Sequence, residues 1–176
     1  MTSPEGVLVA PARVGRGLFA GRAFRRRETV LAIRGRVVHY DLLWQREGSA
    51  FSANCIRFGP ETYLDPGDGP ARYLNHSCAP NTAITKLANR LYLIASRRIA
   101  KGEEIVFDYS TTIGDDDVWQ MRCQCGEPSC RRKVRNFGSL PIDRRAYYLA
   151  NGFVPRFIVR TLADRVSLGM SRHAGL

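Results

Sequence analysis

Short apolar runs separated by turn residues occupy the chain up to about residue 122, and they constrain its fold more than any other feature. The strands expected from them cover residues 7–10, 18–20, 29–38, 54–58, 62–65, 83–87, 90–95 and 105–109. The Ala88-Asn89 pair predicts a two-residue hairpin turn, since asparagine tolerates positive φ. No long amphipathic helix separates these runs, as a parallel α/β core would require. The sequence therefore predicts a mainly β fold of small sheets with short helices.

The last part of the chain changes from a strand pattern to a helical one. Its first apolar stripe consists of Ile142, Ala146 and Leu149, with Tyr147 and Tyr148. Asn151-Gly152 would end that helix, and Pro155 suits the first turn of another. The second helix would carry Phe157, Ile158, Leu162 and Val166. A further short helix is expected over residues 40–47, capped by Asp41.

The composition is that of a folded but strongly basic protein. Hydrophobic residues make up 44% of the 176 residues, and the net charge is +11. Such a surplus is compatible with binding nucleic acid or an acidic partner through the arginine-rich stretches 22–36 and 131–145. Arginine supplies 24 of the 27 basic residues, and arginine-rich coding in a GC-rich genome explains that bias equally well. No apolar run could span a membrane and no signal peptide is evident, so we expect an intracellular protein.

Three of the five cysteines stand in the tight pattern Cys123-x-Cys125-x4-Cys130. Zinc bound by thiolates takes four ligands in a tetrahedron, and Cys78 is the obvious fourth. Such a site would hold the cysteine-rich segment against the middle of the chain and leave no open position for water, which makes it structural. A set of free thiols is the alternative. Cys55 lies in an apolar run and is expected in the core.

Two other stretches are candidate binding segments, one because of its polar residues and the other because of its glycines. Residues 72–78 surround His76 with more hydrogen-bonding side chains than a plain loop needs, although a single histidine is more often structural. Residues 15–20 formally match the G-x-G-x-x-G/A dinucleotide fingerprint. That fingerprint requires a helix directly afterwards, and the arginines at 25–27 offer none, so we reject a Rossmann fold. The two glycines still allow the backbone to approach a ligand closely.

Residues 103–117 reverse the sign of the local charge, because they contain several acidic residues and no basic one. The acidic residues are Glu103, Glu104, Asp108, Asp115, Asp116 and Asp117. This stretch could attract a cationic substrate. For residues 115–117 the simpler expectation is a solvated acidic loop.

Four motifs, in this order and spacing, resemble the SET-domain family of protein lysine methyltransferases over about residues 5–137. They are Gly15-x-Gly17, the RYLNHSC-x-PN stretch at 72–81, the GEEIVFDY stretch at 102–109, and the Cys-x-Cys-x4-Cys pattern of a post-SET tail. The resemblance implies a β-clip type fold of small curled sheets, in which the segments of Asn75 and Tyr109 thread each other as a pseudoknot. It divides the chain into a SET domain over residues 1–122, a zinc-binding post-SET segment over 123–137 and a C-terminal helical extension over 138–176.

The resemblance also implies a set of site residues. The cofactor S-adenosylmethionine would be bound by Gly15, Arg16, Gly17, Leu18, Arg72, Asn75, His76, Tyr109 and Phe137. The catalytic channel would be formed by Tyr109, Phe107 and Tyr73. One structural Zn²⁺ would be held by Cys78, Cys123, Cys125 and Cys130.

The implied activity is methyl transfer from S-adenosylmethionine to a lysine amine in a narrow channel, leaving S-adenosylhomocysteine. Family members carry Phe or Tyr at the position of Phe107, and phenylalanine leaves room for di- or trimethylation. Histones or other basic proteins are the expected substrates, in the cytoplasm or on nuclear chromatin, and the C-terminal helices could pair two copies of the chain. A catalytically inactive SET-like module that binds nucleic acid or acidic protein is the alternative.

The sequence departs from the family pattern at one place that bears on catalysis. Many members carry a second channel tyrosine where this chain has Ala50-Phe51. A lower catalytic efficiency than in members with both tyrosines is therefore expected.

Overall fold

The computed structural model describes residues 6–44, 54–117, 119–160 and 162. Predictions that concern Ala50, Phe51, Val166 and the end of the 40–47 helix lie outside these residues. Within the described part of the chain, no helix has the length and apolar character needed to cross a membrane.

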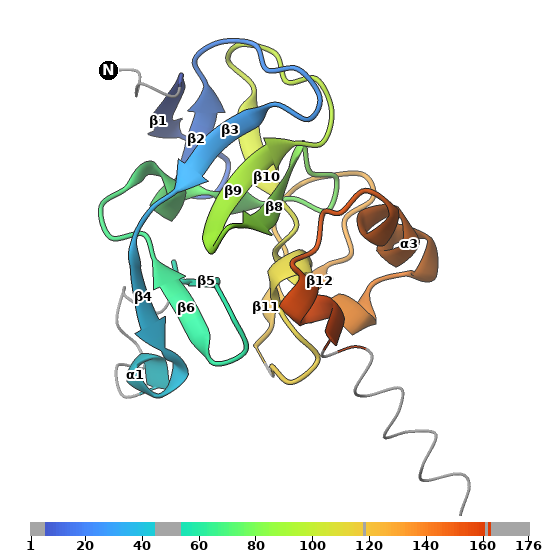
Figure 1. The fold of residues 1–176 in the computed structure, drawn as a ribbon. Helices are drawn as coiled ribbons and strands as arrows, with labels where there is room; N and C mark the ends of the chain where they lie inside the picture. The colour runs from blue at the N-terminus through green and yellow to red at the C-terminus, as the bar shows by residue number, and fades with distance from the viewer. Residues whose placement is uncertain (1–5, 45–53, 118, 161, 163–176) are drawn as a thin grey trace, which may run out of the picture.

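One mixed sheet forms the centre of the molecule (Figure 1). Its strand order is β1-β2-β10-β8-β9-β3, and β7 also pairs with β10. The strands are β1 (Val7–Pro11), β2 (Arg16–Ala20), β3 (Thr29–Ile33), β7 (Asn75–His76), β8 (Thr82–Leu87), β9 (Arg90–Ala95) and β10 (Glu104–Phe107). Neighbours pair antiparallel except that β10 runs parallel to both β7 and β8. Strand β10 is therefore where segments distant in the sequence meet.

The β8–β9 hairpin confirms the local predictions. Ala88 and Asn89 both have positive φ, of 45° and 59°, so they form the expected two-residue turn. In β9, Leu91, Leu93 and Ala95 are fully buried while Tyr92 and Ile94 between them are half-buried, which is the alternation of a strand with one face on the core. Together with Ile84 on β8, these fully buried side chains lie in the main core cluster of the sheet.

A second sheet has the order β4-β6-β5, from β4 (Arg36–His39), β5 (Ile56–Arg57) and β6 (Thr62–Asp65), and α1 (Tyr40–Trp44) follows β4. The prediction of a single strand over 29–38 was wrong, because this run is divided between β3 and β4 in different sheets. The division falls at Gly35, where a Cβ atom would collide with the backbone carbonyl oxygen of Asp65. The apolar residues of the sequence continue on both sides of Gly35, so their pattern could not show where the strand is divided.

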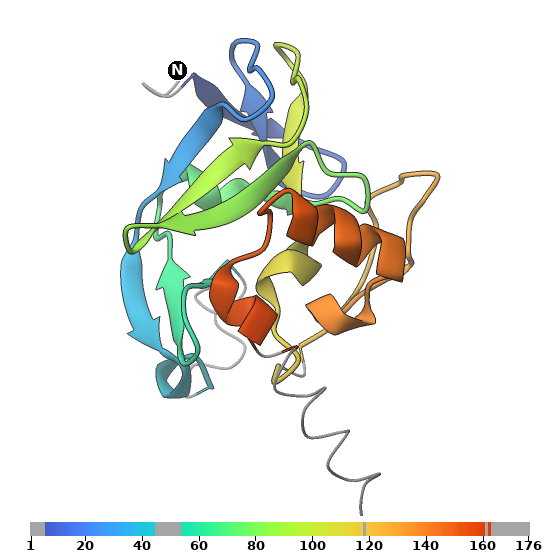
Figure 2. The same ribbon diagram turned by 45° about the vertical axis from the view of Figure 1, so that its right-hand side comes forward.

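The C-terminal part lies beside the central sheet (Figure 2). It contains a small hairpin of β11 (Met121–Arg122) and β12 (Lys133–Val134), helix α3 (Ile142–Ala150), and a helical turn over residues 156–160. Three short 3-10 helices, η1 (Pro70–Tyr73), η2 (Tyr109–Thr112) and η3 (Phe137–Ser139), connect the other elements. A second apolar cluster joins Phe137, Tyr148, Phe153 and Ile158 to Ala83 of β8. Burial of these side chains holds the extension to the sheet.

Helix α3 ends as predicted, with Gly152 at a φ of 66°, but it turns a different face to the core. Tyr148 is buried, whereas Ile142, Ala146 and Leu149 are exposed, Ile142 to 78%. The expectation that these three residues form the buried stripe was therefore wrong. The hydroxyl of Tyr148 donates a hydrogen bond to the buried carboxylate of Asp108, and its ring lies in the second apolar cluster, so both contacts favour the face of the helix that carries Tyr148.

Candidate functional site

The parallel pair β7–β10 brings together the two sequence stretches that are richest in polar motif residues. Asn75 lies opposite Val106, and His76 lies opposite Phe107. Asp108 and Tyr109 follow β10 directly and therefore lie beside His76. Strand β7 was not predicted, because two residues are too few to show a periodic pattern.

Tyr109 is held at both its ends at this junction. Its hydroxyl donates a hydrogen bond to the Leu74 carbonyl oxygen at 2.6 Å, and its backbone N–H donates to His76 Nδ1 at 3.2 Å. Its ring contacts Phe107, with centroids 4.8 Å apart, and lies 6.3 Å from the ring of Trp119. Burial and the charge of Glu104 raise the pKa of Tyr109 to about 12. The phenol therefore keeps its proton at neutral pH and donates it to Leu74, which leaves the hydroxyl oxygen to accept a hydrogen bond from another group.

His76 is uncharged in this environment. Burial lowers its pKa to about 4, against the opposing influence of the Asp108 carboxylate. Because Nδ1 accepts from the N–H of Tyr109, the ring proton resides on Nε2, which lies 3.3 Å from Cys78 Sγ. The imidazole thus connects the backbone of Tyr109 to the cysteine-rich part of the molecule.

The side-chain amide of Asn75 holds the turn between β1 and β2 against the same junction. Its Nδ2 lies 3.1 Å from the carbonyl oxygen of Arg16 and 2.9 Å from Oε1 of Glu104. Gly17 permits this approach, because a Cβ atom there would lie 2.5 Å from Glu104 Oε1. Gly15 has a φ of 60° and nothing within 4 Å of its Cβ direction, so one face of this turn is open. Glu104 was not predicted as a site residue, although its place in the acidic GEEIVFDY stretch marked it.

The remaining predicted residues are not all brought together. The side chain of Leu18 is fully buried, which leaves only its backbone for contact with a ligand. Tyr73 lies beside the site turn, with the Arg16 guanidinium 4.8 Å from its ring centroid. Arg72 instead forms an ion pair with Asp68 at 3.1 Å. Phe137 is completely buried in the C-terminal apolar cluster.

Asp108 links three parts of the chain, whereas the sequence suggested for it only a share in the acidic stretch that could attract a cationic substrate. Its side chain is fully buried, and it accepts hydrogen bonds from Arg131 at 2.7 Å, from the N–H of Ser110 at 3.1 Å and from the Tyr148 hydroxyl at 3.0 Å. A buried carboxylate is stable only with such partners. The contacts fix the residue next to Tyr109 to α3 and to the residue after Cys130. The signal in the sequence was an acidic residue directly after an apolar strand.

The four cysteines predicted to bind metal form one cluster. The sulfurs of Cys78, Cys123, Cys125 and Cys130 all lie within 4.8 Å of one another, and Cys78 and Cys123 are 3.8 Å apart. Burial raises the pKa of Cys78 to about 11, whereas at Cys125 hydrogen bonds from the backbone of Cys78 and Glu127 outweigh burial and lower it to about 7. Cys55 lies outside the cluster and is half-buried, so its expected core position is borne out only in part.

The expectation of a solvated acidic loop at residues 115–117 is borne out only in part, because the segment is a turn with Asp116 exposed but its carboxylates have partners. Asp116 forms an ion pair with the buried guanidinium of Arg57, with a hydrogen bond of 2.7 Å. Asp117 accepts from the Tyr63 hydroxyl at 2.8 Å, and Asp115 accepts from the N–H of Gly138 at 2.9 Å. These carboxylates hold the second sheet and η3 to the segment after η2, so they are not free to attract a cationic substrate.

Comparison with known proteins gives a consistent match. The model of the SET domain matches residues 15–110. Histone-lysine N-methyltransferase 2D of Homo sapiens is 33% identical over 139 residues, which cover 73% of this chain and 2% of that protein. Histone-lysine N-methyltransferase trr of Drosophila melanogaster is 32% identical over 140 residues, or 73% of this chain and 6% of the relative. The H3 lysine-36 specific enzyme of Mycosarcoma maydis is 40% identical over 77 residues, or 40% of this chain and 8% of its own length. The chain thus spans a small fraction of these relatives.

The contact between Tyr148 and Asp108 leads to a prediction about stability. Tyr148→Phe keeps the ring but removes one donor from a buried carboxylate, which should lower the free energy of unfolding by about 2 kcal/mol. Tyr147→Phe is the matched control, because that side chain is 43% exposed. Urea denaturation followed by circular dichroism measures both. Equal midpoints for Tyr148→Phe and Tyr147→Phe would show that the hydroxyl contributes nothing.

Proposed function

The chain belongs to the SET-domain family, and on this premise we propose that it is an S-adenosylmethionine-dependent protein-lysine N-methyltransferase. The match to the SET-domain model and the names of the relatives support the reaction class. The arrangement of Tyr109 is the observation that carries the proposal. Its hydroxyl is fixed on the Leu74 carbonyl at the β7–β10 junction, beside the side chain of Phe107 and next to the segment of Asn75.

The proposed cofactor site is the open turn between β1 and β2. Its floor is formed by the backbone of Gly15, Arg16, Gly17 and Leu18, which Asn75 holds in place. The fit rests on Gly15, since the space above its backbone is open and its positive φ turns the chain sharply. When bound, S-adenosylmethionine supplies a methyl group activated by a sulfonium. We assign His76 a positioning role, because its imidazole accepts a hydrogen bond from the N–H of Tyr109. Arg72 is paired with Asp68, and Phe137 is buried in the second apolar cluster. Each of these two would have to leave its present contacts to reach the cofactor.

The proposed substrate is a lysine side chain, which is nucleophilic only when neutral. With a reference pKa near 10.4, the neutral form costs about 4.6 kcal/mol at pH 7. In the proposed channel, the buried ring of Phe107 and the half-buried ring of Tyr109 would replace water around the amine, and this desolvation disfavours the ammonium form. Tyr109 orients the amine through its hydroxyl, and its raised pKa argues against a role as general base at neutral pH. We infer histones or other basic proteins as substrates, in the nucleus, from the names of the relatives.

We also propose that the cysteine cluster holds one structural zinc ion. Four sulfurs at about 2.3 Å from zinc in a tetrahedron lie about 3.8 Å from one another. Cys78 and Cys123 are separated by 3.8 Å, and the whole set falls within 4.8 Å. All four positions would be filled by thiolates, so the ion would fasten the segment around Cys130 to the residues next to His76.

Removal of the metal tests the zinc proposal. The purified chain should contain about one zinc, and a strong chelator should release it and lower the melting temperature, because structural zinc contributes on the order of 10 kcal/mol to ordering its ligands. The double variant Cys123→Ser/Cys125→Ser should be purified without zinc, and Cys55→Ser should keep it. Elemental analysis with thermal melting provides the measurement. A wild-type chain that is purified metal-free with an unchanged melting curve would refute the proposal.

The proposed catalytic role of Tyr109 is tested by Tyr109→Phe. Loss of the hydroxyl removes the hydrogen bond to Leu74 and the group that orients the amine, so transfer of labelled methyl groups to histones should fall by about 10²-fold. Tyr92→Phe, which alters a half-buried tyrosine on β9, should retain activity. Calorimetric titration of the cofactor separates binding from transfer. Cofactor binding by the wild-type chain without any transfer would instead favour an inactive binding module.

The product state depends on Phe107, which is buried and contacts the ring of Tyr109. Without a second hydroxyl at this position, the wild-type enzyme should proceed to di- or trimethyl-lysine. Phe107→Tyr adds a hydroxyl that can hold water in the channel, so it should shift the product toward monomethyl-lysine. Mass spectrometry of a methylated peptide at long reaction times distinguishes the products. Monomethyl-lysine alone from the wild-type enzyme would contradict this assignment.

A further inference from the structure

Two loops at one end of the central sheet gather an unusual density of positive charge. Residues 21–28 connect β2 to β3, and residues 96–103 connect β9 to β10, so the two loops lie together at the same edge (Figure 1). They carry seven exposed basic side chains, Arg22, Arg25, Arg26, Arg27, Arg97, Arg98 and Lys101. The only acidic residues within them are Glu28 and Glu103.

The loops are fixed in relation to each other by their backbones. Phe24 and Ile99 form an antiparallel bridge, with N–H···O distances of 2.9 and 3.0 Å, and both side chains are buried beneath the loops. Residues next to this bridge therefore project outward. Arg26 and Arg27 both donate to Oδ1 of Asn151, at 3.0 and 3.1 Å, which holds the first loop to the end of α3.

The two acidic side chains serve to fold the loops. Glu28 accepts from the N–H of Arg25 at 2.8 Å and from Arg22 at 2.6 Å, so its carboxylate closes the turn between them. Glu103 accepts from the N–H of Ala100 at 2.9 Å and pairs with Arg97 at 2.6 Å. These internal contacts lower the pKa of Glu28 and keep it charged at neutral pH. Within the described chain, the side chains of Arg25, Arg98 and Lys101 are exposed and make no hydrogen bond, although the charge of Arg25 also acts on Glu28.

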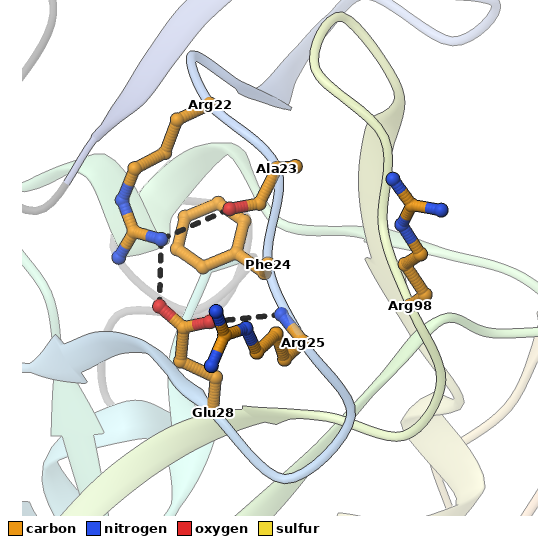
Figure 3. A pocket seen from close by; sticks show the side chains of 6 residues that line it. All are labelled: Arg22, Ala23, Phe24, Arg25, Glu28 and Arg98. Atoms are coloured by element: carbon orange, nitrogen blue, oxygen red, sulfur yellow. Dashed lines mark hydrogen bonds and ion pairs between the residues drawn. The ribbon is translucent and has the colours of Figure 1, made fainter.

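A hollow of about 590 Å³ lies between the two loops. Its charged lining consists of Arg22, Arg25 and Glu28 from the first loop and Arg98 from the second, as Figure 3 shows. A guanidinium group on either loop can donate two parallel hydrogen bonds to a phosphate. The fixed bridge beneath them keeps their spacing, which lowers the entropic cost of binding a polyanion.

We propose that these two loops, named here the 22–28/97–101 surface, bind the phosphate backbone of double-stranded nucleic acid without sequence specificity. The exposed large apolar side chains found in the described residues are Val14, Val37, Tyr40, Leu42, Leu87, Trp119, Ile142, Tyr147 and Leu149. None of them lies on either loop, whereas a protein partner would require an apolar or aromatic anchor. The same observation opposes a single-stranded ligand, since its bases would need exposed aromatic rings to stack on. A duplex presents regularly spaced phosphates and requires only positive charge.

The proposal is independent of the proposed methyltransferase activity and is tested without cofactor or methyl acceptor. Fluorescence anisotropy of a labelled 20-base-pair DNA duplex, titrated with the full chain at several salt concentrations, gives the affinity and its salt dependence. The double variant Arg25→Gln/Arg98→Gln should bind roughly tenfold more weakly at 150 mM salt. Its slope of log affinity against log salt should be smaller in magnitude by about 2, because each lost phosphate contact removes about 0.9.

Arg34→Gln/Arg90→Gln is the matched control. Both arginines are exposed, and they lie at the opposite end of β3 and β9, next to the paired residues Ile33 and Leu91. This variant has the same net charge as the first and should bind like the wild-type chain, and circular dichroism melting curves establish that both variants are folded. Equal weakening in the two variants would overturn the proposal, because net charge alone would then explain binding. So would a duplex affinity weaker than about 10⁻⁴ M at 50 mM salt, or equal binding of polyglutamate or a single strand.

Discussion

A single buried carboxylate, that of Asp108, determines how the parts of this molecule are held together. It is completely inaccessible to solvent and must therefore be surrounded by donors, which come from Arg131, Ser110 and Tyr148. Arg131 follows the last cysteine of the cluster, and Tyr148 belongs to α3. The requirement to satisfy one charge thus brings the cysteine-rich segment and the C-terminal helix to the residue next to Tyr109.

The proposed metal site and the proposed active site are consequently parts of one structure. His76 donates from Nε2 toward Cys78 Sγ and accepts from the N–H of Tyr109, so a shift of the cluster would move the backbone that carries the phenol. The hydroxyl of that phenol is held on the Leu74 carbonyl, only one residue before Asn75, which in turn holds the turn of Gly15 and Gly17. Positioning by contacts of this kind suits a reaction in which the protein orients two reactants rather than supplying acid or base.

The basic surface is connected to the same elements. Strand β10 begins at Glu104, directly after the second loop of the 22–28/97–101 surface, and ends at Phe107, directly before Asp108. Four residues of strand span roughly 13 Å. The proposed duplex would therefore lie near the residues around Tyr109 without contacting them. Arg26 and Arg27, through Asn151, also join this surface to the helix that Tyr148 anchors.

The sequence by itself determined most strands of the central sheet, the Ala88-Asn89 turn, the end of α3 and the residue types of the site, because these depend on local periodicity and backbone preference. It also indicated Cys78 as a partner of the cysteine cluster through the chemistry of four-coordinate thiolates. Only the tertiary structure decided the partners of Asp108, the rotation of α3 that exposes Ile142, the division of 29–38 at Gly35 and the pairing of Asp116 with Arg57. Each of these depends on which groups meet across long stretches of chain, and a contact between distant residues leaves no periodic trace in the sequence.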